Sequence, residues 1–569
     1  MLKLINCAVI LAVTLAASIA CTEQNTATDT CKISVVSFTA SAPEPGEDIS
    51  DLTKTSLDLK TGKASWIEGD QIRIYWGVSE TDNATATAQN SGPSTVFVTD
   101  TEIPNDKAGY WAIYPAIQNA TLSSGKLNPD FSQANRPANF ESAAIATAYT
   151  FRAGGYLEFK NACAIVSFTT DNSNLYEVKL TADGLVGGTS NQVSMYLGNA
   201  AALSSQTTGY YIPIATSTAV KEFTLRLKTK KGEDLPAYHN VEDRVFNASK
   251  LLSLGNIDKR IESTNVSGKG TFRLMSFNIL RGDLNSNTEN CWDNRRDAVM
   301  AMLQTNAPDI LGLQECNSEQ RNQILDEFPE YAAVGISVKG DAVSQYRNVS
   351  SNPILYRSKY FKMEDWDTFW LSETPDISSN TWYYSKPRAA TWALFRINGT
   401  CAKFIYINTH LQDNKSNIKD EYVGQEAEKG VDCRDKQMEV ILEKLSVINT
   451  KGYPVLLAGD FNSAVIKEKF LWFTTYHPCF EELMEIMSDA SKTTPDTDEG
   501  RTLNGFGTTS TSVIDHIFHT DKFKVTTFKV DRNAYSGVTY ISDHYPIYAD
   551  VSLDTSFNSS LGDWSVDEI

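Results

Sequence analysis

The feature that most constrains the fold is a short apolar run with polar residues directly after it. Residues 453–462 read Tyr-Pro-Val-Leu-Leu-Ala-Gly-Asp-Phe-Asn, with four apolar residues between Pro454 and Gly459. Such a run is typical of a strand buried on both faces of a sheet. Asp460 and Asn462 follow where this strand ends, and strand ends are where ligands bind in open α/β sheets.

Five other segments of the second half carry polar side chains at or beside strand-like apolar runs. These side chains belong to Asn278, Gln314 and Glu315, Asn408 and His410, Asp515 and His516, and Asp543 and His544. We expect His516 to pack on the face opposite Asp515, and His519 to lie on the surface. Because all six clusters come from one half of the chain and from strand ends, they predict a single site.

Helical spacing of apolar residues alternates with the strands of the second half. Residues 293–304, 434–448 and 481–487 show that spacing, whereas 413–432 is predicted to be a long charged loop over the cleft. Strands on both sides of each helix favour sheets with helical outer layers. The predicted fold of this half is an α/β four-layer sandwich of two packed mixed β-sheets flanked by helices.

The first half shows β signals throughout. Short runs of alternating polarity are separated by clusters of Gly, Asn, Asp and Ser, and they occupy residues 34–39, 71–76, 94–99, 164–169, 177–181 and 222–227. This pattern predicts one or two all-β sandwiches. A chain of 569 residues also exceeds what one hydrophobic core usually supports, so we expect a multidomain protein.

The formal net charge of −19 restricts the class of partner. A surface with this charge does not attract polyanions, and the second half contains no basic run that would supply several phosphate contacts along a duplex. Bulk charge therefore does not favour long nucleic acid, although a local positive cleft is compatible with it.

The N-terminus has the pattern of a targeting segment. Lys3 precedes an apolar stretch at 4–17, which is too short for an ordinary membrane-spanning helix. Ser18 and Ala20 before Cys21 resemble the lipobox of bacterial lipoproteins. The resemblance implies lipid on Cys21 and a location at the outer membrane or cell surface. The alternative is a plain signal peptide with an incidental cysteine.

The residue types at the predicted site indicate a reaction. Carboxylates and carboxamides without cysteine form the oxygen-rich kind of site that suits Mg²⁺ or Mn²⁺. Histidines beside carboxylates suit proton transfer. Together they describe metal-assisted hydrolysis of a phosphate ester.

Six motifs in order carry a family resemblance. They are Ser276-Phe-Asn278, Leu313-Gln-Glu315, Asn408-Thr-His410, Gly459-Asp-Phe-Asn462, Ile514-Asp515 and Ser542-Asp-His544. This series resembles the endonuclease/exonuclease/phosphatase superfamily, which includes DNase I-like nucleases, sphingomyelinases and inositol phosphatases. The resemblance covers residues 271–553 and implies a DNase I-like fold.

The resemblance implies a metal site and a general base. Glu315 would hold the metal ion, helped by Asn278 and Asp543. Asp460 would position the nucleophile or reach a second metal ion. His544 would activate the attacking water.

It also implies roles for four further residues. Asp515 would orient His544, and Asn462 would position a phosphate oxygen together with Asp460. His410 would donate to the phosphoryl oxygen, and Arg388 would bind the phosphate.

One position departs from the family pattern. Many relatives have a glutamate shortly before the strand that contains Pro353, where it supports the histidine equivalent to His410. This chain has Ser350 or a neighbour there. The departure leaves open the charge state of His410 and the orientation of its side chain.

The first half resembles the fimbrillin-like domains of Bacteroidetes surface proteins, through motifs such as Ala64-Ser-Trp-Ile-Glu-Gly-Asp and Tyr110-Trp-Ala-Ile-Tyr-Pro. The predicted division of the chain is 1–20 signal, 21–31 tether, 32–256 fimbrillin-like domain, 257–270 linker, 271–553 phosphoesterase domain and 554–569 acidic tail.

Two functions remain open at this point. The first is a Mg²⁺- or Mn²⁺-dependent phosphoric ester hydrolase, lipid-anchored at the cell envelope. Its substrate would be a small phosphodiester, a nucleotide, a sugar phosphate, a phospholipid head group or nucleic acid. The second is a surface adhesin whose phosphoesterase-like domain is weak or inactive, with a ligand bound by the β domain.

Overall fold

The structure is a computed structural model that describes most of the chain between residues 33 and 553. The described residues are 33–41, 56–57, 64–77, 81–123, 125–131, 143–182, 192–196, 209–215, 218–220, 222–240, 244–246, 251–263, 265, 270–284, 288–340, 349–470, 473–498, 500–508 and 512–553. Cys21 and the tail from 554 lie outside these ranges, so the lipid anchor and the acidic tail stay predictions.

An eight-stranded sheet dominates the first part of the chain. Its strands in spatial order are β13 (Leu157–Glu158), β2 (Ser37–Ser41), β7 (Ser94–Thr99), β6 (Asn83–Ala88), β5 (Gln71–Trp76), β9 (Tyr110–Tyr114), β12 (Ala146–Thr150) and β14 (Lys160–Asn161). Trp66 is fully buried against the edges of Phe97, Tyr114 and Phe159. These rings form the centre of the core, as alternating strands with one buried face predict.

A second β unit follows, which we call the middle module. It contains a three-stranded sheet, β18 (Tyr210–Ala215), β15 (Cys163–Thr169) and β23 (Leu251–Asn256), and a four-stranded sheet, β17 (Gln192–Tyr196), β16 (Leu175–Thr181), β20 (Phe223–Thr229) and β21 (Tyr238–Asn240). Val166 and Ile212 of one sheet share a buried core with Leu225 of the other. Ile257 is buried in the same core and opens helix α3 (Ile257–Glu262), so a helix occupies the beginning of the expected linker.

Two mixed six-stranded sheets form the second half. The first has the order β26 (Tyr331–Val334), β27 (Ile354–Arg357), β25 (Ile310–Gln314), β24 (Thr271–Asn278), β37 (Ile547–Leu553) and β36 (Phe523–Val530). The second has the order β28 (Phe361–Trp370), β29 (Ala389–Ile397), β30 (Lys403–His410), β31 (Val455–Asp460), β35 (Asp515–His519) and β34 (Ser488–Asp489). Neighbours are parallel in the pairs β24–β25 and β30–β31 and otherwise antiparallel.

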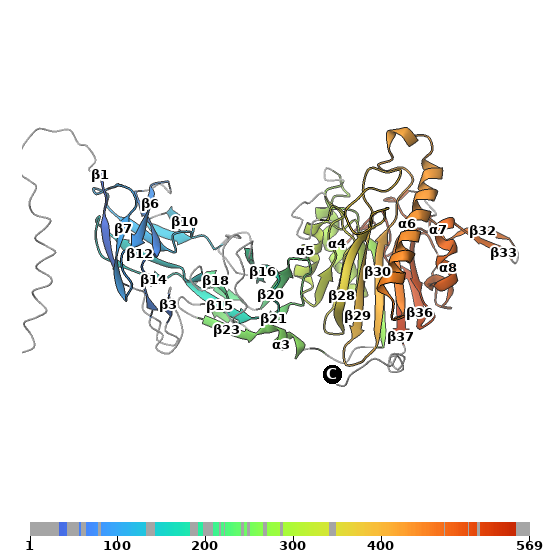
Figure 1. The fold of residues 1–569 in the computed structure, drawn as a ribbon, viewed down its shortest axis with the longest axis horizontal. Coiled ribbons are helices and arrows are strands. Elements are labelled where there is room, and N and C mark those ends of the chain that lie inside the picture. The colour runs from blue at the N-terminus through green and yellow to red at the C-terminus, as the bar shows by residue number, and fades with distance from the viewer. Residues whose placement is uncertain are drawn as a thin grey trace, which may run out of the picture.

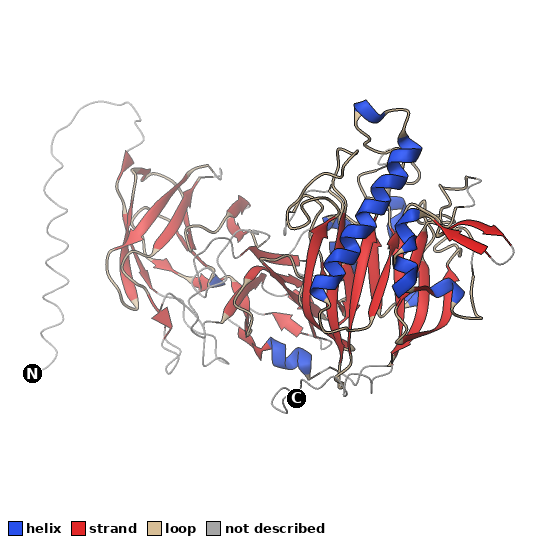
Figure 2. Cartoon of the chain, turned by 45° about the vertical axis from the view of Figure 1, so that its right-hand side comes forward, coloured by secondary structure: helices blue, strands red, loops and turns tan. Residues whose placement is uncertain are grey.

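Helices cover the sheets of this half (Figures 1 and 2), and three apolar layers hold sheets and helices together. Phe272, Phe404 and Leu456 belong to the core between the sheets. Helices α4 (Trp292–Asn306) and α5 (Ser318–Glu327) pack on the outer face of the first sheet. Helices α6 (Glu426–Ile448), α7 (Pro478–Glu481) and α8 (Leu483–Ile486) pack on the second. The predicted four-layer arrangement of this half is confirmed.

One local prediction was wrong in part, and another was wrong. Helix α6 begins at Glu426, so its first turns occupy part of the segment expected to be a charged loop. His519 is 5% exposed and not on the surface. The reason is that β34 pairs outside β35, with Ser488 opposite His519, so β35 is not an edge strand.

Among the described residues, none of the helices combines the length and apolar character needed to cross a membrane.

Candidate active site

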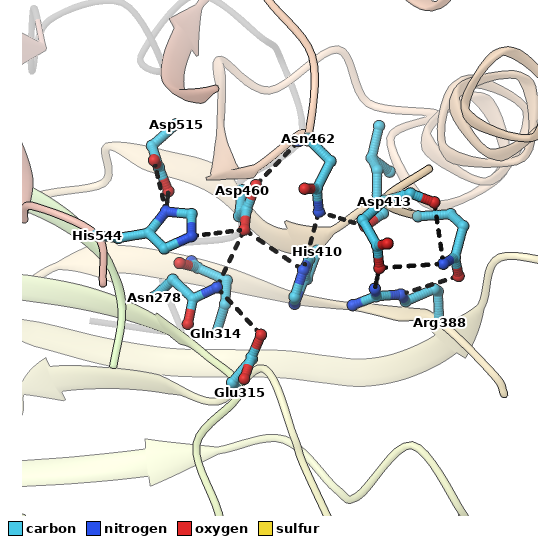
Figure 3. Close-up of polar contacts among 12 residues, drawn as sticks. Asn278, Gln314, Glu315, Arg388, His410, Asp413, Asp460, Asn462, Asp515 and His544 are labelled. Atoms are coloured by element: carbon cyan, nitrogen blue, oxygen red, sulfur yellow. Dashed lines mark hydrogen bonds and ion pairs between the residues drawn. The ribbon is translucent and has the colours of Figure 1, made fainter. Parts of the chain in front are cut away.

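A histidine–aspartate pair lies at one side of the site (Figure 3). Asp515 is the first residue of β35, and His544 lies in the loop that leads into β37. Nδ1 of His544 is 2.9 and 3.1 Å from the two carboxylate oxygens of Asp515. Both side chains are buried, so the contact is shielded from water and the imidazole is held in one orientation.

Asp460 flanks the same histidine on its other side. The strand register places Asp460 opposite Asp515 on one side and opposite His410 on the other. Its Oδ2 is 3.6 Å from Nε2 of His544. The pairing of β30, β31 and β35 therefore brings together His410, Asp460 and Asp515, which are distant in sequence.

The two carboxylates set the charge of His544. Burial lowers the pKa of His544, but the negative charges of Asp515 and Asp460 outweigh it, so the pKa lies well above its ordinary value. Burial raises the pKa of Asp460 to about 7, against the opposing effect of the His544 charge. His544 and Asp460 together therefore hold a proton near neutral pH.

Asn278 connects Asp460 to Glu315. Nδ2 of Asn278 is 3.0 Å from Oδ2 of Asp460 and 3.4 Å from Oε1 of Glu315, while its Oδ1 accepts from the amide of Leu280. Glu315 has a φ of 58°, in the left-handed region that side chains rarely adopt. Strain of this kind persists where neighbouring structure fixes the backbone, and the backbone of Cys316 is paired with another segment directly after it.

His410 is neutral and faces Asn462. Burial lowers the pKa of His410 well below its ordinary value, and the charges of Arg388 and His544 lower it further. Nδ2 of Asn462 is 3.1 Å from Nε2 of His410, so an amide hydrogen meets that nitrogen. We assign the imidazole proton to Nδ1 for this reason.

The position expected to hold a glutamate does not supply a carboxylate to His410. The carbonyl of Ser350 accepts from the amide of Val338, 3.0 Å away, and Ser350 is not among the residues that line the site. Asn462 and Asp460, whose Oδ2 is 3.4 Å from Nε2, are the neighbours of His410.

Two residues that sequence reasoning did not single out hold Arg388. Nε of Arg388 donates to Gln412 at 3.2 Å, and one terminal nitrogen donates to Asp413 at 3.0 Å. The other terminal nitrogen points toward His410 (Figure 3). Gln412 and Asp413 directly follow the His410 strand, and this adjacency was the available signal.

These groups surround one hollow of about 490 Å³. Its lining residues are Glu315, Arg388, His410, Asp413, Asn414, Lys415, Ser416, Asp460, Asn462, Ser512, Ile514, Asp543 and His544. Ile514 is the one aliphatic residue of this set, and none of the set is Phe, Tyr or Trp. The structure thus brings Asp543 to the same hollow as Glu315, Arg388, His410, Asp460, Asn462 and His544, whereas the predicted residues Asn278 and Asp515 lie behind its lining.

The donor set fits a hard divalent cation. Asp460, Asp515 and His544 place one ligand atom each within 4.8 Å of one another. Both oxygens of Asp515 face His544, however, so we regard that trio as a proton-handling group. The oxygen atoms of Glu315 and Asp460 converge on Asn278 instead, and such oxygen donors suit Mg²⁺ or Mn²⁺.

A fold of two packed sheets with this site at their strand ends defines a class of protein, and comparison with known families names it. Residues 275–544 match the model of the Endonuclease/Exonuclease/phosphatase family. The C-terminal half of the chain is therefore a domain of this family, and the family indicates a phosphoester hydrolase. The family match does not include the first half, whose fimbrillin-like resemblance stays a prediction.

Individual relatives are distant. A family member from Bacteroides vulgatus is 26% identical, with 50% of this chain and 100% of that chain covered and a TM-score of 0.42. A mannosyl-6-phosphatase of Bacteroides thetaiotaomicron VPI-5482 is 23% identical, with 50% and 100% covered and a TM-score of 0.41. The uncharacterized protein L388 of Acanthamoeba polyphaga mimivirus is 23% identical over 288 residues, which are 48% of this chain and 98% of that protein.

Proposed function

We propose that the protein is a divalent-metal-dependent hydrolase of small, polar phosphate esters. The observation that carries the proposal is the buried His544–Asp515 pair, whose His544 lines one hollow together with Asp460, Glu315 and Arg388. A base with an orienting carboxylate, an acidic metal site and a cation for the phosphate are the parts that such a reaction needs.

The roles follow from the geometry. The terminal nitrogen of Arg388 that points toward His410 binds a phosphate oxygen. The side-chain amide of Asn462 donates to His410 and to the carbonyl of Leu411, so it orients His410 and does not bind the phosphate as expected. His544 takes a proton from the attacking water when it is neutral, and Asp515 stabilises the imidazolium that forms. A divalent cation held by Glu315 and Asp460, with Asn278 or Asp543, would neutralise phosphate charge and lower the pKa of bound water.

The lining of the hollow narrows the substrate. Stacking on aromatic side chains is the usual way to hold a nucleobase, and a lipid tail needs apolar walls. The described lining residues offer neither, but they include Asp413, Asn414 and Ser416, whose oxygens and amides suit hydroxyl groups. We therefore place phosphate esters of polyhydroxylated molecules, such as sugar phosphates, before nucleotides and phospholipids.

The test compares four reactions on a panel of a sugar phosphate, a chromogenic phosphodiester, a nucleotide and sphingomyelin. They are the wild type with Mg²⁺, the wild type with EDTA, His544→Ala, and His239→Ala, an exposed histidine of the middle module. We expect turnover of the sugar phosphate that disappears with EDTA and in His544→Ala and persists in His239→Ala. Equal turnover in the wild type and His544→Ala would contradict the proposed mechanism.

Ser350 is the observation that favours the second candidate, a surface adhesin with a weak phosphoesterase-like domain. Absence of turnover on every substrate of the panel would favour it. We propose for either function a lipid anchor at Cys21 and a location at the outer membrane or cell surface. Incorporation of labelled fatty acid that is lost in Cys21→Ser tests this anchor.

A further inference from the structure

The middle module lies against the phosphoesterase domain (Figure 1), and the connection between β20 and β21 contacts it. The amide of Asp234 donates to the carbonyl of Ala333 at 2.8 Å, and the amide of Ala333 donates back at 3.0 Å. Ala333 belongs to β26, the edge strand of the first sheet. The module therefore extends that sheet by a backbone pair and covers a strand edge that would otherwise be open.

A buried ion pair lies beside this backbone contact. Asp234 of the module is 2.5 Å from Arg321 of helix α5, and the two side chains are 5% and 7% exposed. Arg321 also donates to the carbonyl of Gly232 in the module, at 3.1 Å. Separating the two units would leave a buried carboxylate and a buried guanidinium without these partners, which is costly.

A second arginine crosses in the opposite direction. Arg226 of β20 is 6% exposed, and it donates to the carbonyls of Tyr331 at 2.7 Å and Leu325 at 2.9 Å in the phosphoesterase domain. Burial lowers the pKa of Arg226, while the charge of Asp234 raises it. Arg226 of the module therefore donates to the phosphoesterase domain, and Arg321 of that domain donates to the module.

The same connection reaches the other sheet. The Lys231 ammonium is 4.4 Å from the ring centre of Trp366 and donates to the Trp366 carbonyl. Trp366 lies in β28, the edge strand of the second sheet. One short segment of the module therefore contacts the edge strands of both sheets.

We propose that this surface is a permanent interface within the chain, so that the middle module and the phosphoesterase domain form one rigid unit that unfolds cooperatively. The partner of the edge strands β26 and β28 is then the module itself and not another protein. The inference is independent of catalysis, because none of its residues lines the active-site hollow.

Three versions of the whole chain without the signal segment test the interface by calorimetry and by hydrogen exchange of the peptides covering α5 and β26. They are the wild type, Asp234→Ala, and Lys179→Ala. Lys179 pairs with Asp326 across the same interface at 2.7 Å, but the two side chains are 16% and 33% exposed. Exposed pairs contribute little to stability, so Lys179→Ala is the matched control.

We expect the module and the phosphoesterase domain of the wild type to melt in one transition. Asp234→Ala should lower that Tm by about 5 °C or more and speed exchange in α5 and β26, whereas Lys179→Ala should change both little. Because Asp234 also contacts Lys228 within the module, exchange on the phosphoesterase side is the decisive reading. Separate transitions in the wild type, or faster exchange confined to the module in Asp234→Ala, would overturn the proposal.

Discussion

At the scale of single residues, the site is governed by charges that share a buried space. His544 lies between the carboxylates of Asp515 and Asp460, and all three side chains are buried. Charge interactions are strong in such surroundings, so the protonation of each group depends on the others. His410 lies close by but is kept neutral, because burial and the charges of Arg388 and His544 act in the same direction.

The substitution Asp515→Asn tests this arrangement. An amide keeps the shape but removes the charge that stabilises the His544 imidazolium, so we expect kcat/KM to fall by about 10²–10⁴-fold. The carboxylates raise the pKa of His544, and only the neutral imidazole accepts a proton. Activity of the wild type should therefore rise with pH above 6.5, and the rise should move to lower pH in the variant. Initial rates across pH measure both effects, and an unmoved profile would count against His544 as the base.

At the scale of elements, strand pairing collects the site. The parallel pair β30–β31 ends at His410 and Asp460, and the antiparallel neighbour β35 begins there with Asp515. Positive φ angles at Glu315 and Asn462 turn two further side chains at strand ends. The site therefore depends on the ends of strands that are rigid along their length.

His519 at the other end of β35 gives a prediction about stability. Burial lowers the pKa of His519, whose Nε2 is 2.9 Å from the hydroxyl of Thr493 and whose Nδ1 is 2.9 Å from the carbonyl of Thr520. The imidazole of His519 thus binds a second proton less readily in the folded state than in the unfolded state. The contribution of the neutral form is complete above pH 6.5 and is lost as pH falls from there toward the folded pKa.

We expect His519→Gln to cost about 1 kcal/mol at pH 7.5 through the weakened hydrogen bonds. The difference between wild type and variant should shrink at pH 5, because acid penalises the wild-type histidine. Urea unfolding at the two pH values measures it, and a constant difference would show that His519 titrates as it does in the unfolded chain.

At the scale of the whole molecule, the net charge of −19 and the small polar hollow both favour a small substrate over a long nucleic acid. A duplex requires several Lys or Arg contacts to its phosphates, and Arg388 and Lys415 are the only Lys or Arg among the described residues that line the hollow. The molecule is therefore suited to small esters that enter the hollow.

We expect no retention of duplex DNA in a gel-shift assay at about 0.15 M salt. Under the same conditions, hydrolysis of a small phosphate ester should proceed at a rate that salt changes little. Tight, salt-sensitive binding of DNA would instead reveal a positive surface that the charge of the molecule does not suggest.

The sequence by itself determined which residues stand at strand ends and the layered architecture of the second half. Apolar runs followed by Asp460 or Glu315 are local signals, and the period of the apolar residues in α4 and α6 reports which face is buried. The order of six motifs then indicated the family that residues 275–544 match.

Only the tertiary structure decided the contacts that depend on neighbours from distant segments. The burial of His519 follows from the pairing of β34, and the hold of Asp413 on Arg388 joins residues 25 positions apart. The ion pair of Asp234 with Arg321 joins two units whose separate patterns give no sign of each other. Periodicity describes one element at a time, whereas burial and pairing are properties of the packed assembly of elements.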